Sequence, residues 1–327
     1  MLMTLNEAFR RSENPDLSVI VVNYNTLHLV PEMMTALAAA AEGLTLQVIV
    51  IDNASRDGSA GHIRQDWPQV ELLANTENVG FGRANNQALP LVRSANVLLL
   101  NTDAFVQPGS LRAALGVLAQ HPECGIVGVR LVGRDGTVQP SCRYFPTAWN
   151  LLLVSTGLAK LFPRARLIDD PHWDDRRPAE CDWVPGAFLL IRKAVVDQVG
   201  LFDPRFFLYY EEVDLCRAAK RVGWTVRYCP DTDVVHIGGE SAKSEGNLSA
   251  AGRQLPALQV ESELLYFRKH YGLAGVLGGL ALGLLGDAIL ASKKLLGRAR
   301  GAGPPFSHSA LAWRVFMRTR LATRPTR

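Results

Sequence analysis

An apolar run that ends abruptly in polar residues carries the first side chain that could do chemistry, Asp103. Val97–Leu100 are all apolar, and Asn101 and Thr102 stand between them and Asp103. Such a run predicts a buried strand, and ligands of open α/β sheets bind beyond the carboxyl ends of the strands. Asp103 is therefore a candidate for holding a metal ion that is bound to phosphate. The alternative is a simple turn, because Asn, Thr and Asp are all common turn residues.

A cluster of carboxylates is the second candidate. Glu211, Glu212 and Asp214 lie within four positions, and five aromatic residues precede them in 202–210. Clustered acids repel one another and raise one another's pKa, which is unfavourable if the cluster serves packing alone. The alternative is an acidic helix start, favoured by the helix dipole, with Asp214 paired to Arg217. We expect both: the acids begin a helix and one of them also acts chemically.

A single imidazole is the third candidate. His236 follows the apolar residues Val234 and Val235 and precedes Ile237-Gly238-Gly239. A lone His is more often structural than a ligand, so its role depends on what lies beside it in the fold.

The elements that must position these residues begin with four apolar strands. They are expected at 17–22, 47–51, 70–74 and 97–100, with helices over about 27–41 and from about 59, and a polar loop at 78–86. Parallel strands need helical crossovers, so the pattern predicts an α/β fold with a Rossmann-like, doubly wound and mostly parallel sheet. The chain lacks both Gly-x-Gly-x-x-Gly after the first strand and a Gly-Lys-Ser/Thr loop. These absences argue against dehydrogenases and P-loop ATPases.

The pattern of strands and helices continues beyond Asp103. A helix is expected at 110–120, strands at 125–132 and 183–191, and a further helix at 193–199. Residues 140–180 differ in character, with two Phe-Pro pairs and dense Asp and Arg. Such a stretch is typical of a variable surface excursion, where an acceptor could be selected.

The distribution of charge separates the chain into two parts. Of its 327 residues 48% are hydrophobic and 20% charged, as is ordinary for a soluble protein, and the formal charge is +4. Nine Lys or Arg and no Asp or Glu follow Asp287, which leaves residues 1–287 with a net charge of −5. A basic tail on an acidic body predicts an anionic partner for the tail. The apolar residues just before the tail favour a membrane over nucleic acid.

The cysteines and the N-terminus bear on the compartment. Five cysteines, without a Cys-x-x-Cys pair, suit a reducing compartment and no structural zinc. Residues 1–16 carry both charges and lack a sustained apolar core, so the expected location is cytoplasmic.

Seven segments, taken together in their order and spacing, form a specific pattern. They are Val-Val-Asn-Tyr-Asn (21–25), Asp-Asn-Ala-Ser-Arg-Asp-Gly-Ser (52–59), Asn-Val-Gly-Phe-Gly-x-Ala-Asn-Asn (78–86), Leu-Asn-Thr-Asp (100–103), Val-Pro-Gly-Ala-Phe (184–188), Glu-Glu-Val-Asp-Leu-Cys-Arg (211–217) and His236. This pattern resembles the inverting glycosyltransferases of family 2, with the GT-A fold, and especially their bacterial rhamnosyltransferase-like branch. The resemblance covers about two thirds of the chain.

The resemblance implies roles for individual residues. Asp103 would be the last acid of the family's Asp-x-Asp motif and hold Mg²⁺ or Mn²⁺ on the diphosphate, with His236 as a further metal ligand. Glu212 would be the general base, supported by Glu211 and Asp214. Where many members have the first Asp of that motif, this chain has Asn101, as is common in this branch. The implied donor-binding residues are Asn23, Asn25, Asp52, Asn78, Gly80, Arg83, Asn85, Asn101 and Asp103, and the implied acceptor-binding residues are Trp183, Pro185, Gly186 and Ala187.

The region after residue 271 extends beyond the resemblance. Tyr271–Gly286 contains no charge, which is at the margin of the ~20 apolar residues that span a bilayer. Gly275, Gly279 and Gly283 at four-residue spacing would permit close helix packing. Four bases follow at Lys293, Lys294, Arg298 and Arg300. This pattern predicts an interfacial helix on anionic lipid, with a buried helix pair of a soluble protein as the alternative.

The sequence thus predicts an N-terminal tail (1–16), a GT-A domain (17–241), a connecting helical segment (242–271) and a C-terminal helical, membrane-associating extension (272–327). The expected activity is transfer of a sugar from a nucleotide-diphosphate donor to a glycan or lipid-linked acceptor at the inner face of the cell membrane, and the candidate sugar is rhamnose from dTDP-rhamnose. Nucleic acid is not an expected partner, and a homodimer is left open. The alternatives are a sugar nucleotidyltransferase and a nucleotide-sugar-binding protein that has lost catalysis.

Overall fold

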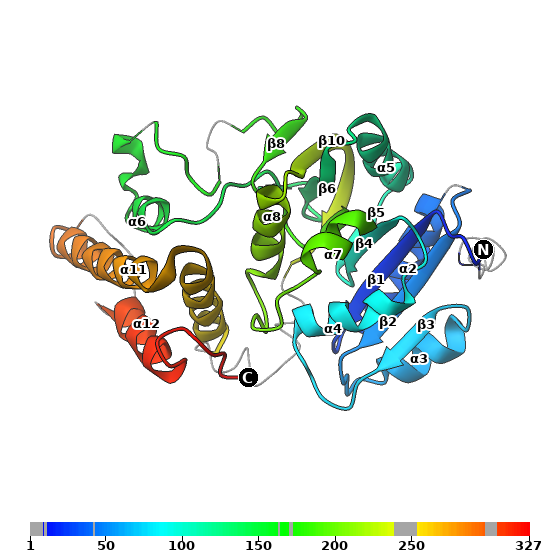
Figure 1. Cartoon of the computed structure of the whole chain (residues 1–327), viewed down its shortest axis with the longest axis horizontal. Coiled ribbons are helices and arrows are strands. Elements are labelled where there is room, and N and C mark those ends of the chain that lie inside the picture. Colours follow the sequence, from blue (N-terminus) through cyan, green and yellow to red (C-terminus); the bar gives the residue numbers. More distant parts are fainter. Residues whose placement is uncertain are drawn as a thin grey trace. The chain divides into compact units, whose positions relative to one another are not determined.

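The structure is a computed structural model that describes residues 9, 12–41, 43–162, 164–169, 173–238, 254–297 and 306–327, apart from the side chains of 254–256. Most of the predicted tail 1–16 and residues 242–253 of the predicted connecting segment lie outside these ranges. The chain forms two compact units (Figure 1). The first comprises 1–143, 173–204 and 211–251, and the second comprises 144–172, 205–210 and 252–327.

A ten-stranded sheet organises the first unit (Figure 1). Its main path runs in the order β3-β2-β1-β4-β9-β6-β10-β5, while β7 pairs with β6 and β8 pairs with β10. The strands are β1 (Leu17–Asn23), β2 (Leu46–Asp52), β3 (Glu71–Ala74), β4 (Asn96–Asn101), β5 (Ala104–Val106), β6 (Cys124–Val132), β7 (Val138–Gln139), β8 (Ala179–Cys181), β9 (Phe188–Arg192) and β10 (Thr225–His236).

The direction of the strands changes across the sheet. β3, β2, β1 and β4 are mutually parallel, and β6 is parallel to β10. Between these two groups β9 runs antiparallel to both β4 and β6. The Rossmann-like α/β class expected from the sequence is confirmed, and the sheet is mixed. Each of β1, β2 and β3 is followed by a helix before the next parallel strand, as parallel pairing requires.

Helices cover the two faces of this sheet. Alternate residues of β1, β2 and β4 pack with α2 (Val30–Ala41), α3 (Ser59–Asp66) and α5 (Ser110–Gln120) in one large apolar core. The remaining face meets α4 (Phe81–Ala88), α7 (Lys193–Val199) and α8 (Glu211–Arg221). Because both faces are covered, β1 and β2 are buried along their whole length.

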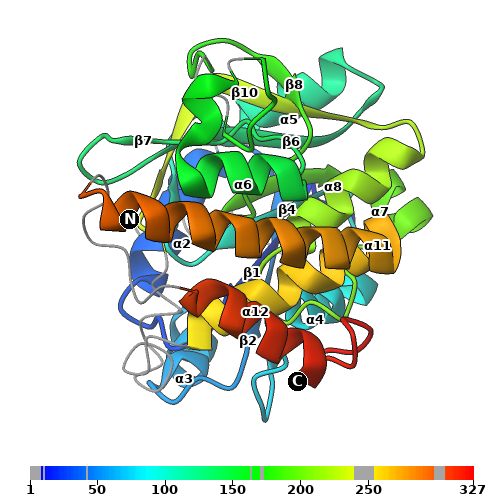
Figure 2. The same ribbon diagram turned by 90° about the vertical axis from the view of Figure 1, so that its left-hand side faces the viewer.

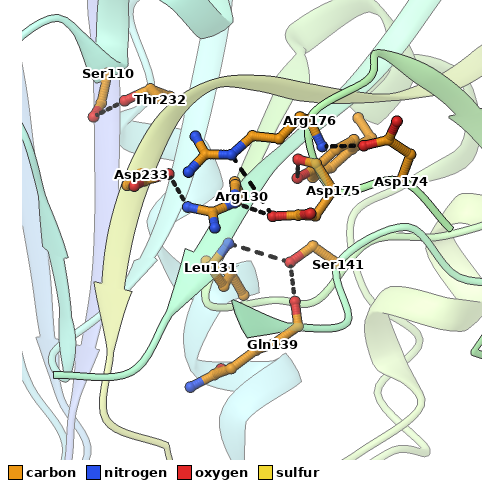
Figure 3. Close-up of polar contacts among 11 residues, drawn as sticks. Ser110, Arg130, Leu131, Gln139, Ser141, Asp174, Asp175, Arg176, Thr232 and Asp233 are labelled. Carbon is orange, nitrogen blue, oxygen red and sulfur yellow. Dashed lines mark hydrogen bonds and ion pairs between the residues drawn. The ribbon is translucent and has the colours of Figure 1, made fainter. Parts of the chain in front are cut away.

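A β-bulge shapes the end of β10. The pairing of β10 with β6 shifts register between Cys229 and Asp233. Arg130, on β6 and with a side chain only 7% exposed, holds this region through Asp233 (2.7 Å) and Asp175 (2.6 Å), as Figure 3 shows. Bulges re-aim the strand that carries them. After the bulge β10 pairs antiparallel with β5, where His236 lies opposite Ala104.

The second unit is helical. It contains α6 (Ala148–Thr156), η2 (Leu158–Leu161), α11 (Gln254–Leu295) and α12 (Ser307–Arg318), and α11 packs against both α6 and α12 (Figure 2). Gly272, with φ of 69°, kinks α11 into two helices. A separate apolar core joins Val260, Leu264 and Phe267 to residues of the second half of α11 and of α12.

Two local predictions differ from the structure. The segment 78–86, expected to be a loop, becomes α4 from Phe81 onward, because Gly80 adopts a positive φ of 90° at the helix start. The expected strand 183–191 begins only at Phe188. Residues 183–187 form a connecting segment, and its geometry matters for the site.

Candidate active site

Polar residues at the ends of β1 and β2 form one hydrogen-bonded cluster. Asn23 Nδ2 donates to Asp52 Oδ1 (2.7 Å) and to Ser55 Oγ (3.0 Å), and both Asn23 and Asp52 are buried. Asn25 has a left-handed φ of 52°, its N–H donates to Ser55 Oγ and its Oδ1 accepts from the Arg56 N–H. The cluster therefore fixes the loops after two neighbouring parallel strands, the place where such sheets bind ligands.

A second cluster holds the start of α4. Asn53 Nδ2 donates to Asn78 Oδ1 (2.9 Å), and Asn78 Oδ1 also accepts from the Gly80 N–H (2.9 Å). Arg83 Nε on α4 donates to the Pro204 carbonyl (2.8 Å), which holds the segment after α7. Asn85 is different, because its amide donates to the Phe81 carbonyl within the same helix and the side chain is buried. The structure therefore groups Asn78, Gly80 and Arg83 but places Asn85 inside the helix packing.

Thr26 connects the β1 loop to the end of β4. Its Oγ1 lies 2.7 Å from Asn23 Oδ1 and 2.9 Å from Thr102 Oγ1. Thr102 precedes Asp103, so the loops of three neighbouring strands, β2, β1 and β4, form a continuous polar edge.

Asp103 and His236 come together beside this edge. Asp103 Oδ1 lies 3.6 Å from His236 Nε2, and Asp103 Oδ2 accepts from the Gly238 N–H (3.0 Å). Both groups are largely buried, with 7% of the Asp103 side chain and 16% of the His236 side chain exposed. Burial lowers the pKa of His236, while the negative charge of Asp103 opposes this shift. The lowered pKa favours the neutral imidazole at pH 7.

Gln139 orients that imidazole. Its Oε1 lies 2.8 Å from His236 Nδ1, and its Nε2 donates to the His236 carbonyl (2.7 Å). Because an amide oxygen can only accept, Nδ1 must carry the proton in this contact and the lone pair of Nε2 faces Asp103. Gln139 is itself fixed, since Ser141 Oγ links its carbonyl to the Leu131 N–H (Figure 3).

This donor pair suits a divalent cation. Ligand atoms about 2.1 Å from a common ion lie roughly 3–4 Å apart, which matches the spacing of Asp103 Oδ1 and His236 Nε2. A carboxylate and a neutral imidazole both coordinate such ions. Among the residues that the structure describes, no group of three or more His, Cys, Asp or Glu could hold a metal. The pair could therefore hold an ion whose other ligands come from substrate and water.

The segment 183–187 lies between this edge and α8. Its Ala187 carbonyl accepts from the Asn101 N–H (3.1 Å) at the end of β4. At its other end the backbone of Val184 lies near the Cys216 thiol on α8. Pro185 and Gly186 between them are half-buried, and a Cβ on Gly186 would meet no atom within 4 Å. The segment therefore borders open space at its centre.

Arg143 contacts Trp183, and its charge acts on Glu212. Its N–H donates to the Trp183 carbonyl (3.1 Å), and its guanidinium lies 5.0 Å from the centroid of the Trp183 ring. Burial raises the pKa of Glu212, and the positive charge of Arg143 partly offsets the rise. Glu212 and Cys216 are one helical turn apart and share a face of α8. The carboxyl most suited to act as a base thus lies on the helix face that meets the 183–187 segment.

The other two acids, Glu211 and Asp214, have surroundings that suit a structural role. Glu211 and Asp214 are each 3% exposed in the first turn of α8, where the helix dipole favours negative charge. The predicted acidic helix start is present. Of the three carboxylates, Glu212 is the one most exposed to solvent.

The backbone of the two residues before α8 is strained. Tyr209 and Tyr210, directly before Glu211, have φ of 72° and 70°, a region that aromatic residues rarely adopt. Strain of this kind persists only where the surroundings enforce it, and it clusters at functional sites. Within the second unit, Tyr210 Oη donates to Glu263 Oε2 (3.2 Å) and Ser262 Oγ donates to the Leu208 carbonyl (2.8 Å).

Comparison with known proteins assigns the family. Residues 15–255 match the family described as "Glycosyltransferase like family 2". The chain belongs to glycosyltransferase family 2. A curated relative of this glycosyltransferase, an N-acetylglucosaminyl-diphospho-decaprenol L-rhamnosyltransferase of Mycobacterium tuberculosis, is 30% identical over 67% of this chain and 75% of its own length. A low-salt glycan biosynthesis hexosyltransferase of Haloferax volcanii is 27% identical over 68% and 67%.

Solved structures show the fold of this glycosyltransferase. A mannosyltransferase from Pyrobaculum calidifontis, in complex with GDP-Man and Mn²⁺, superposes with a TM-score of 0.56 at 17% identity and covers 98% of this chain and 88% of its own. The GT-A fold expected from the sequence is confirmed.

Several polar residues beside the candidate site residues were not predicted from the sequence. Gln139, Arg143, Ser55 and Thr26 each contact a predicted residue. Ser55 and Thr26 lie in or next to the family segments, so their positions carried a signal. Arg143 lies in the stretch 140–180 that was expected to be variable, Gln139 lies directly before it, and nothing local distinguishes either residue.

Proposed function

We propose that this protein is an inverting, metal-dependent glycosyltransferase that moves a sugar from a nucleotide-diphosphate donor to a hydroxyl of a glycan or lipid-linked acceptor. The observation that carries the proposal is the pairing of Asp103 with an oriented, neutral His236 at the edge formed by the loops after β1, β2 and β4. A pair of this kind suits a diphosphate-bound cation better than it suits packing, because two polar groups are buried against each other.

Mg²⁺ or Mn²⁺ is the proposed cation, held by Asp103 and His236. When bound, it would neutralise the negative charge that develops on the departing diphosphate. Its use by this chain is supported by the donor set and by the Mn²⁺ in the related mannosyltransferase structure. Many family members have an acid where this chain has Asn101. Asp103 is therefore the one carboxylate of the proposed cation site, and it supplies the negative charge of that site.

The donor is proposed to lie along the polar edge. Asp52, held by Asn23, is the proposed contact to the base. Asn78, Gly80 and Arg83, at the start of α4, are the proposed contacts to the nucleoside. dTDP-rhamnose is the first donor to test, because the relative from M. tuberculosis is named an L-rhamnosyltransferase.

Glu212 is the proposed general base. Burial raises its pKa and so brings its basicity closer to what proton abstraction from a hydroxyl needs at neutral pH. The acceptor hydroxyl would lie beside Pro185 and Gly186, between Trp183 and Ala187, and lose its proton to Glu212 as it attacks the sugar. A single displacement of this kind inverts the anomeric centre.

The proposed location is the cytoplasmic face of the cell membrane. The name of the M. tuberculosis relative specifies a decaprenyl-linked substrate, and an acceptor of that class is confined to the bilayer. The second unit has a helix apolar enough to meet lipid. No nucleic acid partner is proposed, and a homodimer is left to measurement.

The test begins with a panel of dTDP, UDP and GDP sugars and a polyprenyl-diphosphate glycan acceptor. Glu212→Gln should lower turnover by ~10²–10⁴ while donor affinity stays unchanged, because general-base catalysis contributes about that much. The control is Glu123→Gln, an exposed carboxylate that pairs with Arg227, and it should match the wild type. NMR of the product should show the inverted anomer.

The pH dependence of the same variants adds a second readout. The base must be deprotonated, so wild-type turnover should fall as pH drops through the raised pKa of Glu212, at a pH above the ordinary glutamate value of about 4.3. Glu212→Gln should lack this acid limb. Near-normal turnover by Glu212→Gln would refute the base, and wild-type binding of a donor without transfer to any acceptor would indicate a binding protein.

A further inference from the structure

Exposed apolar side chains gather in the second unit. Among the residues that the structure describes, fifteen large hydrophobic side chains are exposed, and all but Val222 lie on or directly beside α6, η2, α11 and α12. A soluble surface scatters such residues singly, whereas a gathering of them marks an interaction site.

The second half of α11 carries one uncharged stripe. Leu273 (39% exposed), Leu277 (44%), Leu284 (47%) and Leu285 (48%) recur at helical spacing. Ala274, Gly278 and Ala281 fall on the same side and are also exposed. The opposite side is occupied, since Gly286 faces Leu152 and Thr156 of α6, and Gly279, Leu280 and Gly283 line a small enclosed cavity with Ala312 of α12. The stripe therefore points away from both neighbouring helices.

Helix α12 adds an apolar ridge with a basic border. Phe306 (43% exposed), Trp313 (45%) and Met317 (64%) lie along one side, while Val315 and Phe316 are buried in the unit's core. The exposed bases Arg314 and Arg318 follow Trp313 and Met317 by one position each, so they stand beside the ridge.

The same face extends to the segment around α6. Trp149 (46% exposed) and Phe162 (43%) stack edge to face with ring centroids 5.3 Å apart, and Leu161, directly before Phe162, is 71% exposed. Figure 2 shows α6, the second half of α11 and α12 side by side in one layer. Aromatic rings at the border of an apolar surface are typical of the membrane interface.

The distribution of charge on α11 and α12 favours binding to an anionic partner. The acids of the described residues after 253 are used inside the unit: Glu261 accepts from Thr326, Glu263 from Tyr210, and Asp287 from the Ser309 N–H. The bases Lys294, Arg314, Arg318 and Arg320 are exposed. Bases near an anionic leaflet each add roughly 1 kcal/mol to binding.

The packing of α11 argues against a span. The helix from Ala257 to Leu295 is long and apolar enough to cross a membrane, and an 18-residue stretch of it has a mean hydropathy of 2.0, but Gly272 kinks it. Its second half binds α6 through Lys293 Nζ and the Thr156 carbonyl (2.6 Å), and binds α12 through Asp287. Because one side of the second half of α11 is held against α6 and α12, only its other side can face lipid.

We propose that the α11 stripe, the α12 ridge and the Trp149–Phe162 pair form one surface that inserts shallowly into an anionic membrane, with α11 and α12 lying in the plane of the interface. Shallow amphipathic insertion combines burial of leucine and aromatic side chains with attraction of bases to acidic headgroups. The inference rests on the proposed membrane location of the enzyme and not on its donor.

The test is co-sedimentation of the full-length protein with phosphatidylcholine vesicles and with vesicles that also contain phosphatidylglycerol. Wild type should bind the anionic vesicles, and binding should weaken with added salt. Trp313→Ser/Met317→Ser and Leu277→Ser/Leu284→Ser should each weaken binding at least about tenfold, and Arg314→Gln/Arg318→Gln about tenfold at low salt only. Val222→Ser, 53% exposed in the first unit, is the matched control and should bind as wild type does.

Two measurements keep the outcomes distinct. Unchanged thermal unfolding and unchanged nucleotide-sugar hydrolysis in the surface variants would show that fold and active site are intact, so a loss of vesicle binding would support the surface. Equal binding by all variants, or no binding by wild type, would overturn it. A fall in molar mass by light scattering in the same variants, without vesicle binding, would assign the face to a second copy of the chain and also overturn the proposal.

Discussion

Gln139 shows how a single residue can set the chemistry of a pair. His236 could present either ring nitrogen to Asp103, and the amide oxygen of Gln139 selects the tautomer with Nδ1 protonated. The second contact, from Gln139 Nε2 to the His236 carbonyl, fixes the amide orientation that makes this possible. Residues behind a metal ligand commonly tune affinity in this way, so Gln139 is a positioning residue for the proposed cation.

The prediction for Gln139 is a loss of metal affinity. Gln139→Ala should weaken Mn²⁺ binding in the presence of a nucleoside diphosphate by about 10–100-fold, while turnover at saturating Mn²⁺ changes little. Titration calorimetry and Mn²⁺-dependent kinetics measure the two quantities. Gln198→Ala, which loses only a surface contact to Trp224 Nε1, is the control. Unaltered Mn²⁺ affinity in Gln139→Ala would remove the positioning role.

Strand β6 supports the 183–187 segment through close packing. A Cβ on Gly128 would lie 2.5 Å from Val184 Cβ, nearer than such atoms approach one another. Glycine at this position therefore lets the 183–187 segment lie directly against the strand. The segment is held at its other end by the Asn101 N–H, so its position depends on two strands rather than on its own sequence.

At the scale of this element, Gly128→Ala should cost about 1–3 kcal/mol of unfolding free energy through overpacking. It should also lower turnover, because Val184 and with it Pro185 and Gly186 must shift. Gly116→Ala on α5 meets no atom within 4 Å and should stabilise the protein by roughly 0.5–1 kcal/mol. Urea unfolding and transferase assays of both variants provide the comparison, and a normal stability and rate for Gly128→Ala would contradict the packing account.

The whole molecule has two hydrophobic cores. One joins the sheet with α2, α3 and α5, and the other joins α11 and α12. The chain crosses between the two units several times, since 144–172 and 205–210 belong with the C-terminal helices. The strained tyrosines before α8 lie at one of these crossings, so the two residues that lead into α8 belong to the second unit.

Two cores predict two unfolding transitions. Leu37→Ala should lower the unfolding free energy of the sheet unit by about 2–5 kcal/mol and so lower the midpoint temperature of its transition. Phe316→Ala should lower the unfolding free energy of the helical unit by about 3–5 kcal/mol, because each substitution leaves a cavity. Differential scanning calorimetry resolves the transitions, and a nucleoside diphosphate should raise only the one that Leu37→Ala lowers. A single transition shifted equally by both substitutions would show that the units unfold together.

Much of the sheet unit followed from local pattern. The apolar runs at 17–22, 47–51 and 97–100 became β1, β2 and β4, and the acidic run began α8 at Glu211. These elements were predictable because periodicity, chain breaks and helix dipoles act over a few neighbouring residues. The family segments also predicted the pairing of Asp103 with His236, although their roles remain predictions.

Tertiary structure alone decided the rest. The sequence by itself determined which residues could serve as ligand, base and membrane anchor, because it specifies the chemistry of each side chain and the spacing between neighbouring residues. Contacts between residues far apart in the chain decide the direction of β9, the orientation of His236 by Gln139 and the packing of α6 with the C-terminal helices. They also decide that the charge of Arg143 acts on Glu212. Such contacts form only where the packing of two cores brings distant segments together, and no local pattern specifies them.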